Sequence, residues 1–270
     1  MGSGIAESVA VAGLPVILHD IDERRLERAR HGVDRSLGRA VAGGKLAEAH
    51  AHVARGRIEL TTDLGRIGHA GLVIEAVPED QRLKLEVIHA VDELVGPDTI
   101  IASNTSSIPI AELAGAVRQP ERVLGLHFFS PVPVMTLVEV VVALDTSAQT
   151  LETAKSFVEQ IGKRPIVTKD RSGFIVNMLL VPYLMAAVRM YEDGFASRED
   201  IDAGMRLGCG HPMGPLVLCD FIGLDVLYSV CDSLYAEFKR DEYAPPPLLK
   251  RMVASGRMGR KSGRGFYDYT

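Results

Sequence analysis

The chain has 270 residues, of which 47% are hydrophobic and 24% charged, and its formal net charge is −5. This balance is typical of a globular protein, and an acidic chain without long runs of like charge is a poor partner for nucleic acid. The longest apolar stretch, 178–188, contains Pro182 and is shorter than the ~20 residues of a membrane-spanning helix. The first residues lack the basic and apolar regions of a secretion signal, so we expect a cytoplasmic protein without a membrane segment.

The first 170 residues alternate short apolar runs with longer helical patterns, which is typical of βαβ units. Strands are predicted over 15–19, 58–61, 72–77, 99–102, 123–128, 136–142 and 165–167. Helices are predicted over 4–12, 23–42, 79–94, 110–116 and 147–161. The pattern therefore predicts an α/β domain with a mostly parallel sheet.

After Asp170 the strand signals disappear and every predicted element is a helix. These helices cover 173–191, 197–207, 216–238 and 246–254. The change places a domain boundary near residue 170, between an α/β domain over 1–170 and an all-helical domain over 171–270. The three cysteines, Cys209, Cys219 and Cys231, are odd in number and too widely spaced for a metal-binding pair, so we expect reduced thiols and no metal site.

The first predicted helix begins near Gly2-x-Gly4 and leads to an apolar strand that ends before Asp20. In a dinucleotide-binding βαβ unit, glycines open the helix and an acid about 20 residues later binds a ribose hydroxyl. Asp20 lies eighteen positions after Gly2 and would favour NAD over NADP, because a carboxylate repels a 2′-phosphate. The same residues also fit an ordinary helix start and a solvated acid, so other residues have to decide the cofactor.

Two polar segments follow predicted strands. The stretch SNTSS at 103–107 comes directly after one strand, and His127 stands at the end of the next, before a proline-rich loop. Parallel strands present ligands at their carboxyl ends, so both segments are candidates for a site. Helix capping by the serines and a structural role for the histidine are the alternatives.

Glu139 stands alone in an apolar strand, twelve positions after His127. A buried carboxylate needs a partner, and a hairpin through the proline loop would return Glu139 to His127. The carboxylate would then fix the imidazole tautomer and make His127 a general base for a secondary alcohol that loses hydride to a nicotinamide. Ser106 and Asn177 are candidates to hold the reacting oxygen or the imidazole, with helix capping and helix-surface polarity as their alternatives.

Six separated motifs together resemble the L-3-hydroxyacyl-CoA dehydrogenase family, in particular the bacterial 3-hydroxybutyryl-CoA dehydrogenases. The motifs are SNTSS at 103–107, GLHFFSP at 125–131, VPVM at 132–135, LVEV at 137–140, GFIVN at 173–177 and GRKSGRGFY at 259–267. They occur in the family's order over essentially the whole chain. The resemblance implies a Rossmann-like NAD-binding domain, a helical dimerisation domain, and an acyl-CoA thioester bound between them.

The resemblance also implies roles for the matching residues. His127 would be the general base, Glu139 its electrostatic partner, and Ser106 and Asn177 would contact the substrate oxygen and the active-site hydrogen bonds. Contacts to the cofactor are implied for Gly2, Asp20, Glu79, Lys84, Ser106, Ser130 and Lys261. Contacts to CoA, whose phosphates need cationic partners, are implied for Ser36, Lys45 and Ser106.

The main departure from the family lies at the amino terminus. Family members begin with a strand and then Gly-Ala-Gly-Thr-Met-Gly, so Met1 and Gly2 would be the last two residues of that loop. That strand is normally central, so we expect a gap between the strands at 15–19 and 72–77. Either the chain starts at an internal methionine of a longer protein, or it is a short form with a damaged cofactor site. We favour the first because the downstream catalytic positions are intact.

The sequence thus predicts NAD-dependent oxidation of L-3-hydroxyacyl-CoA, in particular 3-hydroxybutyryl-CoA, to 3-ketoacyl-CoA by a homodimer. One alternative is a cofactor-deficient acyl-CoA-binding protein, which would bind acyl-CoA but not NADH. Another is a sister dehydrogenase of a free hydroxy acid such as L-gulonate, which would be indifferent to the CoA group. Acyl-chain length, direction and pathway, among fatty-acid β-oxidation, butanoate metabolism and aromatic degradation, stay open.

Overall fold

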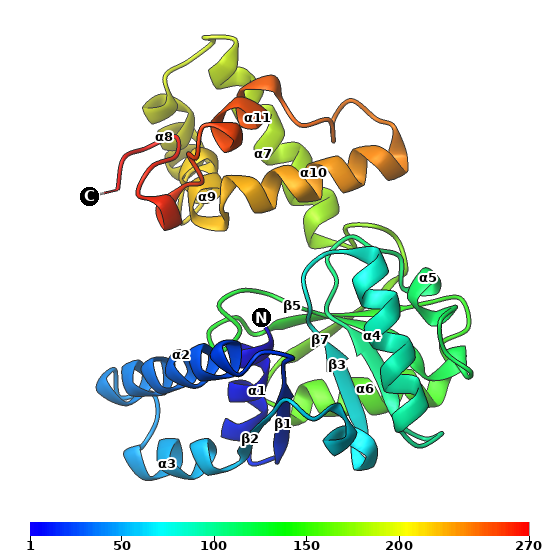
Figure 1. Cartoon of the computed structure of the whole chain (residues 1–270). Helices are drawn as coiled ribbons and strands as arrows, with labels where there is room; N and C mark the ends of the chain where they lie inside the picture. Colours follow the sequence, from blue (N-terminus) through cyan, green and yellow to red (C-terminus); the bar gives the residue numbers. More distant parts are fainter. Residues whose placement is uncertain (270) are drawn as a thin grey trace. The chain divides into compact units, whose positions relative to one another are not determined.

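The computed structural model describes residues 1–269, and the chain divides after Asp170 into two compact units (Figure 1). The first unit carries all the strands of the described chain, and the second is built from helices. The fold class is therefore the one predicted, α/β followed by all-helical.

The first unit contains two sheets. Its strands are β1 (Val16–His19), β2 (Ile58–Thr61), β3 (Leu72–Glu75), β4 (Ile100–Ser103), β5 (Val123–Phe128), β6 (Leu137–Val142) and β7 (Arg164–Lys169). β1 pairs in parallel with β2, and the other strands form a sheet of order β3-β4-β5-β6-β7 in which only β5 and β6 are antiparallel. Within residues 1–269 no strand ladder joins β1 to β3, which is where the sequence predicts a gap.

The helices of the first unit surround these strands (Figure 1). They are α1 (Gly2–Val11), α2 (Glu23–Ala42), α3 (Glu48–Gly56), α4 (Gln81–Leu94), α5 (Ile110–Ala114) and α6 (Ala148–Gln160), with 3-10 turns η1 (Leu64–His69) and η2 (Pro120–Arg122). Asp22, Asp80 and Ser147 cap α2, α4 and α6 by accepting a hydrogen bond from a first-turn amide. The sequence reading missed α3, whose N-cap is Ala47 and has no side-chain hydrogen bond to mark its start.

The core of the first unit is centred on the five-stranded sheet. Every residue of β4 and β5 is buried, and Ile5 and Val9 of α1 pack in the same apolar cluster. Gly125 allows the close packing of β5, because an added Cβ would lie 2.8 Å from Val141 Cβ and 2.9 Å from Ile110 Cδ1. The buried strands hold their carboxyl ends at one edge of the sheet.

The second unit consists of α7 (Val176–Glu192), α8 (Arg198–Cys209), α9 (Pro215–Ile222), α10 (Leu224–Phe238), α11 (Pro247–Ala254) and the turn η3 (Arg260–Ser262). The prediction of one helix over 216–238 is wrong, because Gly223 adopts φ 103° and separates α9 from α10. The Asp220 carboxylate accepts hydrogen bonds from the backbone amides of Phe266 and Tyr267, both at 2.9 Å, and so ties the C-terminal segment to α9. None of the helices within residues 1–269 has the length and apolar character to span a membrane.

Candidate active site

A buried histidine–carboxylate pair lies in the β5–β6 hairpin. His127 and Glu139 are register partners across the two strands, and His127 Nδ1 lies 2.7 Å from Glu139 Oε2. The side chains are 8% and 1% exposed, so the contact is screened little by water. Phe129 packs on the imidazole, with ring centroids 4.6 Å apart. The hairpin thus holds the imidazole in one orientation and places a carboxylate on one of its two ring nitrogens.

The serine-rich loop after β4 is organised by a single carboxylate, that of Glu79. Glu79 Oε1 accepts hydrogen bonds from Thr105 Oγ1 at 2.6 Å and from the backbone amides of Ser106 and Ser107 at 3.0 and 3.1 Å. It also accepts from the hydroxyls of Ser106 and Ser107. Burial raises the pKa of Glu79, but the Thr105 hydrogen bond, the Lys84 charge and the Ser106 amide outweigh it, so this pKa lies below its ordinary value. The ionised Glu79 carboxylate is therefore favoured, and it accepts the hydrogen bonds of the loop.

Lys84 of α4 lies behind this loop and is only 1% exposed. Its Nζ donates to Glu75 Oε1 at 2.9 Å, to Glu75 Oε2 at 3.1 Å and to the Val77 carbonyl at 3.1 Å. It also lies 3.4 Å from Glu79 Oε2. The ammonium group is enclosed by protein acceptors. It therefore acts on the serine-rich loop through the carboxylates of Glu75 and Glu79.

Asn104 connects the serine-rich loop to the histidine strand. Its side-chain Oδ1 accepts from the backbone amide of Phe128, next to His127, at 2.9 Å. Its own amide donates to the Glu75 carbonyl at 2.8 Å. Glu75, Glu79, Ser106 and His127 thus belong to one connected edge of the sheet. The sequence reading included neither Glu75 nor Asn104, although the first ends a strand and the second belongs to SNTSS.

The amino-terminal end of α1 reaches the same edge. A Cβ added to Gly2 would lie 3.6 Å from Leu18 of β1 and 3.8 Å from Ala76 after β3, so the helix begins between the carboxyl ends of those strands. The N-cap residue Met1 makes no side-chain hydrogen bond to the first turn. Asp20 follows β1 and its side chain is 34% exposed; its Oδ1 accepts a 3.2 Å hydrogen bond from Asp22 N and lies 3.9 Å from Arg25 Nη1. Backbone amides at a helix start, which donate to a pyrophosphate, and a nearby carboxylate, which accepts from a ribose hydroxyl, fit a dinucleotide.

Of the three residues expected to contact CoA, Ser36 and Lys45 lie on or near α2, in different surroundings. Ser36 Oγ donates to Glu7 Oε1 of α1 at 2.7 Å. Burial raises the pKa of Glu7, against the opposing effects of the Ser36 hydrogen bond and the Arg39 charge. Lys45 lies exposed in the turn after the helix. Ser36 is therefore already engaged within the protein, whereas Lys45 faces solvent.

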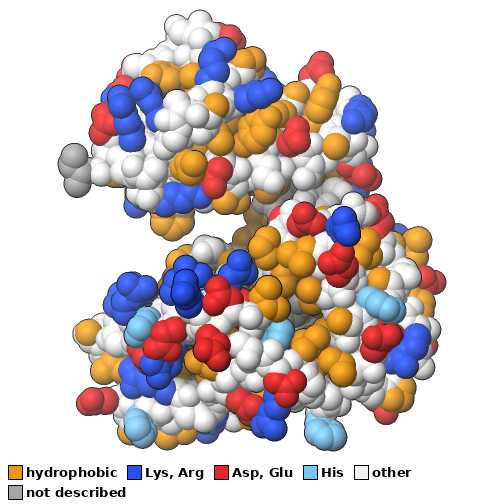
Figure 2. All heavy atoms as spheres, viewed as in Figure 1, with side chains coloured by type: hydrophobic (Ala, Val, Ile, Leu, Met, Phe, Trp, Pro, Cys, Tyr) orange, Lys and Arg blue, Asp and Glu red, His pale blue; other side chains and the backbone are white. Residues whose placement is uncertain are grey.

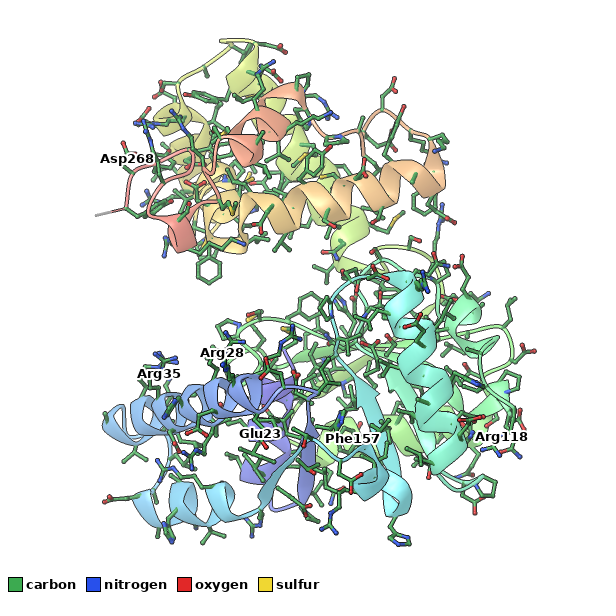
Figure 3. The ribbon with its side chains drawn as sticks, viewed as in Figure 1. Glu23, Arg28, Arg35, Arg118, Phe157 and Asp268 are labelled. Atoms are coloured by element: carbon green, nitrogen blue, oxygen red, sulfur yellow. The ribbon has the colours of Figure 1, made fainter. Side chains whose placement is uncertain are left out.

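A basic face of α2 was not recognised in the sequence. Arg24, Arg28, Arg35 and Arg39 are all exposed and follow each other at intervals of four, seven and four residues, which places them on one side of a helix. Figure 2 shows Lys and Arg side chains gathered over α2, and Figure 3 shows Arg28 and Arg35 projecting from the same side of it. These two arginines line a shallow surface depression together with His31 and Asp34. The interval itself was the signal that could have identified this face.

The remaining site candidates are Ser130 in the first unit and Asn177 and Lys261 in the second. Ser130 is exposed and follows β5 in the loop before Pro131. Asn177 is the second residue of α7 in the second unit and is half-buried. Lys261 lies in η3 of the same unit, where its Nζ donates to Asp225 Oδ2 at 2.5 Å. The structure therefore connects His127, Glu139, Ser106, Glu79 and Lys84 within one unit, while Asn177 and Lys261 belong to the other.

Comparison with known proteins relates both units to one family. Residues 1–171 match the domain described as "3-hydroxyacyl-CoA dehydrogenase, NAD binding domain", and residues 173–269 match the "3-hydroxyacyl-CoA dehydrogenase, C-terminal domain". The chain is 49% identical to a 3-hydroxybutyryl-CoA dehydrogenase of Mycobacterium tuberculosis over all of its length and 95% of that protein. It is 43% identical to the mitochondrial hydroxyacyl-coenzyme A dehydrogenase of Sus scrofa, over all of its length and 88% of that protein.

Solved structures give the same relation. The crystal structure of Mycobacterium tuberculosis FadB2 matches with a TM-score of 0.99 and 49% identity, over 100% of this chain and 95% of that one. That of (S)-3-hydroxybutyryl-CoA dehydrogenase from Ralstonia eutropha matches with a TM-score of 0.94 and 44% identity, over the same shares of the two chains. These matches confirm the predictions of fold class, of an oxidoreductase and of NAD as its cofactor. The chain belongs to the 3-hydroxyacyl-CoA dehydrogenase family.

Proposed function

We propose that the protein oxidises the hydroxyl group of an L-3-hydroxyacyl-CoA, with 3-hydroxybutyryl-CoA as its substrate, to the 3-ketoacyl-CoA, using His127 as general base. The observation that carries this proposal is the 2.7 Å contact between His127 Nδ1 and Glu139 Oε2 inside a buried hairpin. A carboxylate in that position favours one tautomer of the imidazole and stabilises the imidazolium that forms when a proton is taken up. The names of the Mycobacterium and Ralstonia relatives support the choice of substrate.

The residues at the edge of the sheet fit NAD. The first turn of α1, beginning at Gly2, would face the pyrophosphate, and Asp20 would accept hydrogen bonds from a ribose. Bound there, NAD supplies the hydride acceptor. Glu79 and Lys84 would support this cofactor site from behind through the serine-rich loop, and Ser130 and Lys261 would complete it.

The proton transfer is assigned to His127. As the carbon–hydrogen bond at C3 breaks, the hydroxyl proton passes to His127 Nε2, because Nδ1 already faces Glu139. Ser106 and Asn177 would hold the substrate oxygen, which gains carbonyl character during the step. In the reverse direction the imidazolium returns the proton to the same oxygen.

The CoA moiety is assigned to the exposed face of α2. CoA carries three phosphate groups, and Arg28 and Arg35 with Lys45 offer cations on or just beyond this helix. Ser36 would join them if its hydroxyl turned from Glu7 Oε1, to which it donates, towards a phosphate oxygen. We also propose that the protein forms a homodimer through the helical unit and that it acts on acyl-CoA in the cytoplasm.

The test uses the wild-type chain and His127→Gln with acetoacetyl-CoA and NADH, followed by the loss of NADH absorbance. Wild-type turnover is expected, with a loss of about a hundredfold or more in the variant, since general acid–base groups contribute about 10²–10⁴-fold. L-gulonate with NAD serves as the comparison substrate and is expected to give no turnover. An unchanged rate in His127→Gln would refute the role of the imidazole, and preference for L-gulonate would refute the substrate class.

A further inference from the structure

We propose that Glu75 is a positioning residue for this site: it holds together the two turns that carry Glu79 and Ser106. The proposal rests on the proposed function and adds to it a residue that contacts neither substrate nor cofactor. Glu75 is the last residue of β3 and lies in register with Ser103, the last residue of β4. From this position its backbone and side chain reach both of the turns that follow these strands.

Glu75 is only 4% exposed, and its carboxylate accepts hydrogen bonds from groups at the start of both turns as well as from Lys84. Val77 N donates to Oε1 at 2.6 Å, which closes the turn leading to Glu79. Ser103 Oγ donates to Oε2 at 2.5 Å, at the start of the serine-rich loop. The Glu75 carbonyl also accepts from Asn104 N at 2.8 Å. One residue therefore fixes the beginning of both segments.

The charge of Glu75 also determines where Lys84 lies. The Lys84 ammonium is 1% exposed, and a buried cation without a carboxylate partner is strongly unfavourable. Glu75 contacts it at 2.9 Å, whereas the nearer oxygen of Glu79 is 3.4 Å away. With Glu75 neutralised, Lys84 has only Glu79 as an anionic partner, and the two would be drawn together.

A displacement of Glu79 towards Lys84 would change the serine-rich loop directly. Glu79 Oε1 holds the amides of Ser106 and Ser107, so a displaced Glu79 releases the loop that presents the Ser106 hydroxyl. The same loop contacts the histidine strand through Asn104 and Phe128 N. Glu75 thus acts on the reacting groups through Lys84 and Glu79, without touching them.

The experiment measures hydrogen–deuterium exchange and steady-state kinetics on the full chain carrying Glu75→Gln. Glutamine keeps an oxygen for Val77 N and removes the charge opposite Lys84. We expect the amides of Ser106 and Ser107 to exchange about tenfold faster, because they lose a fixed acceptor. We expect kcat with acetoacetyl-CoA and NADH to fall by about 10–100-fold, with KM for acetoacetyl-CoA changed less than about threefold.

Asp92→Asn is the matched control. Asp92 is also 1% exposed, lies in the last turn of the same helix α4, and is paired with Arg118 and Arg122. It stands eight residues from Lys84, about 12 Å along the helix. This variant removes a buried carboxylate and lowers stability, but is expected to leave exchange at the serine-rich loop and kcat within about threefold of wild type.

Ser103→Ala provides a second, milder test should Glu75→Gln fail to fold. It removes one hydrogen bond to Glu75 and is expected to change loop exchange and kcat in the same direction, by about three- to tenfold. Wild-type exchange at Ser106 and Ser107 in the folded Glu75 variant, or in Ser103→Ala, overturns the proposal, as does an equal effect of Asp92→Asn. Hydrogen–deuterium exchange can be measured without turnover. If the wild-type chain is inactive, that result counts against the proposed function, and the exchange data still test the role of Glu75.

Discussion

Replacing Glu139 by glutamine removes the negative charge next to His127 and keeps the size of the side chain. Unit charges about 4 Å apart interact by about 4 kcal/mol at an effective dielectric constant near 20, which suits a pair that is 8% and 1% exposed. A neutral hydrogen bond from the imidazole to glutamine recovers about 1 kcal/mol of this. The imidazolium therefore loses about 3 kcal/mol of stabilisation, which corresponds to a decrease in kcat of about 10²–10³-fold.

The assay is NADH oxidation with acetoacetyl-CoA at saturating concentrations of both, so that kcat and each KM are obtained separately. Because Glu139 lies behind the imidazole in the buried hairpin, KM values should change little. Asp92→Asn again controls for the loss of a buried carboxylate from the same unit. The reasoning is refuted if Glu139→Gln keeps kcat within about threefold of wild type, or if it raises KM and leaves kcat unchanged.

Three further predictions concern the cofactor, the CoA group and stability. Asp20→Asn should raise KM for NADH by about tenfold, the equivalent of ~1.4 kcal/mol, and increase relative activity with NADPH, because the repulsion of a 2′-phosphate is lost; unchanged cofactor preference would contradict this role. The double variant Arg28→Ala with Arg35→Ala should raise KM for acetoacetyl-CoA at low salt by about tenfold but leave KM for acetoacetyl-pantetheine, which lacks the nucleotide phosphates, unchanged; equal effects on both substrates would argue against a phosphate contact. Burial raises the pKa of Glu7 above its unfolded value, so the stability that protonated Glu7 contributes is present below the ordinary glutamate pKa and lost as the pH rises through the folded pKa. As the pH rises across that interval, the free energy of unfolding of Glu7→Gln, measured with urea, should therefore increase relative to that of wild type. A difference in this free energy that does not depend on pH would contradict the raised pKa of Glu7.

The contact between His127 and Glu139 was predictable from the sequence because local patterns determine it. An apolar strand interrupted by one glutamate requires a partner for the carboxylate, and the proline loop after His127 predicts the hairpin that supplies it. The register pairing of His127 with Glu139 agrees with this reasoning. The assignment of Ser106 to the same edge was predictable for a similar reason, since parallel strands end together.

The support of the site was not predictable in the same way. Lys84 sits in a helix of ordinary amphipathic pattern, and nothing in that pattern distinguishes a solvated lysine from one that is 1% exposed. Its burial depends on Glu75 and Glu79, which lie outside that helix, at the end of β3 and in the turn between β3 and α4. Likewise the break between α9 and α10 depends on the positive φ of Gly223, whereas apolar periodicity continues on both sides.

Within residues 1–269 no strand ladder joins β1 to β3, so we expect the segment from β1 to β2 to be the weaker half of the first unit and the five-stranded sheet the stronger half. The segment from β1 to β2 has a small apolar cluster that contains Val33, Leu37 and Ala51, and it reaches the larger core of the five-stranded sheet through Val16 of β1. The weaker half should therefore open locally at a lower free energy than global unfolding requires. Asp20 belongs to the weaker half and Ser106 to the stronger one. A dinucleotide that contacts both residues would therefore raise the free energy of local opening of the weaker half by its binding free energy.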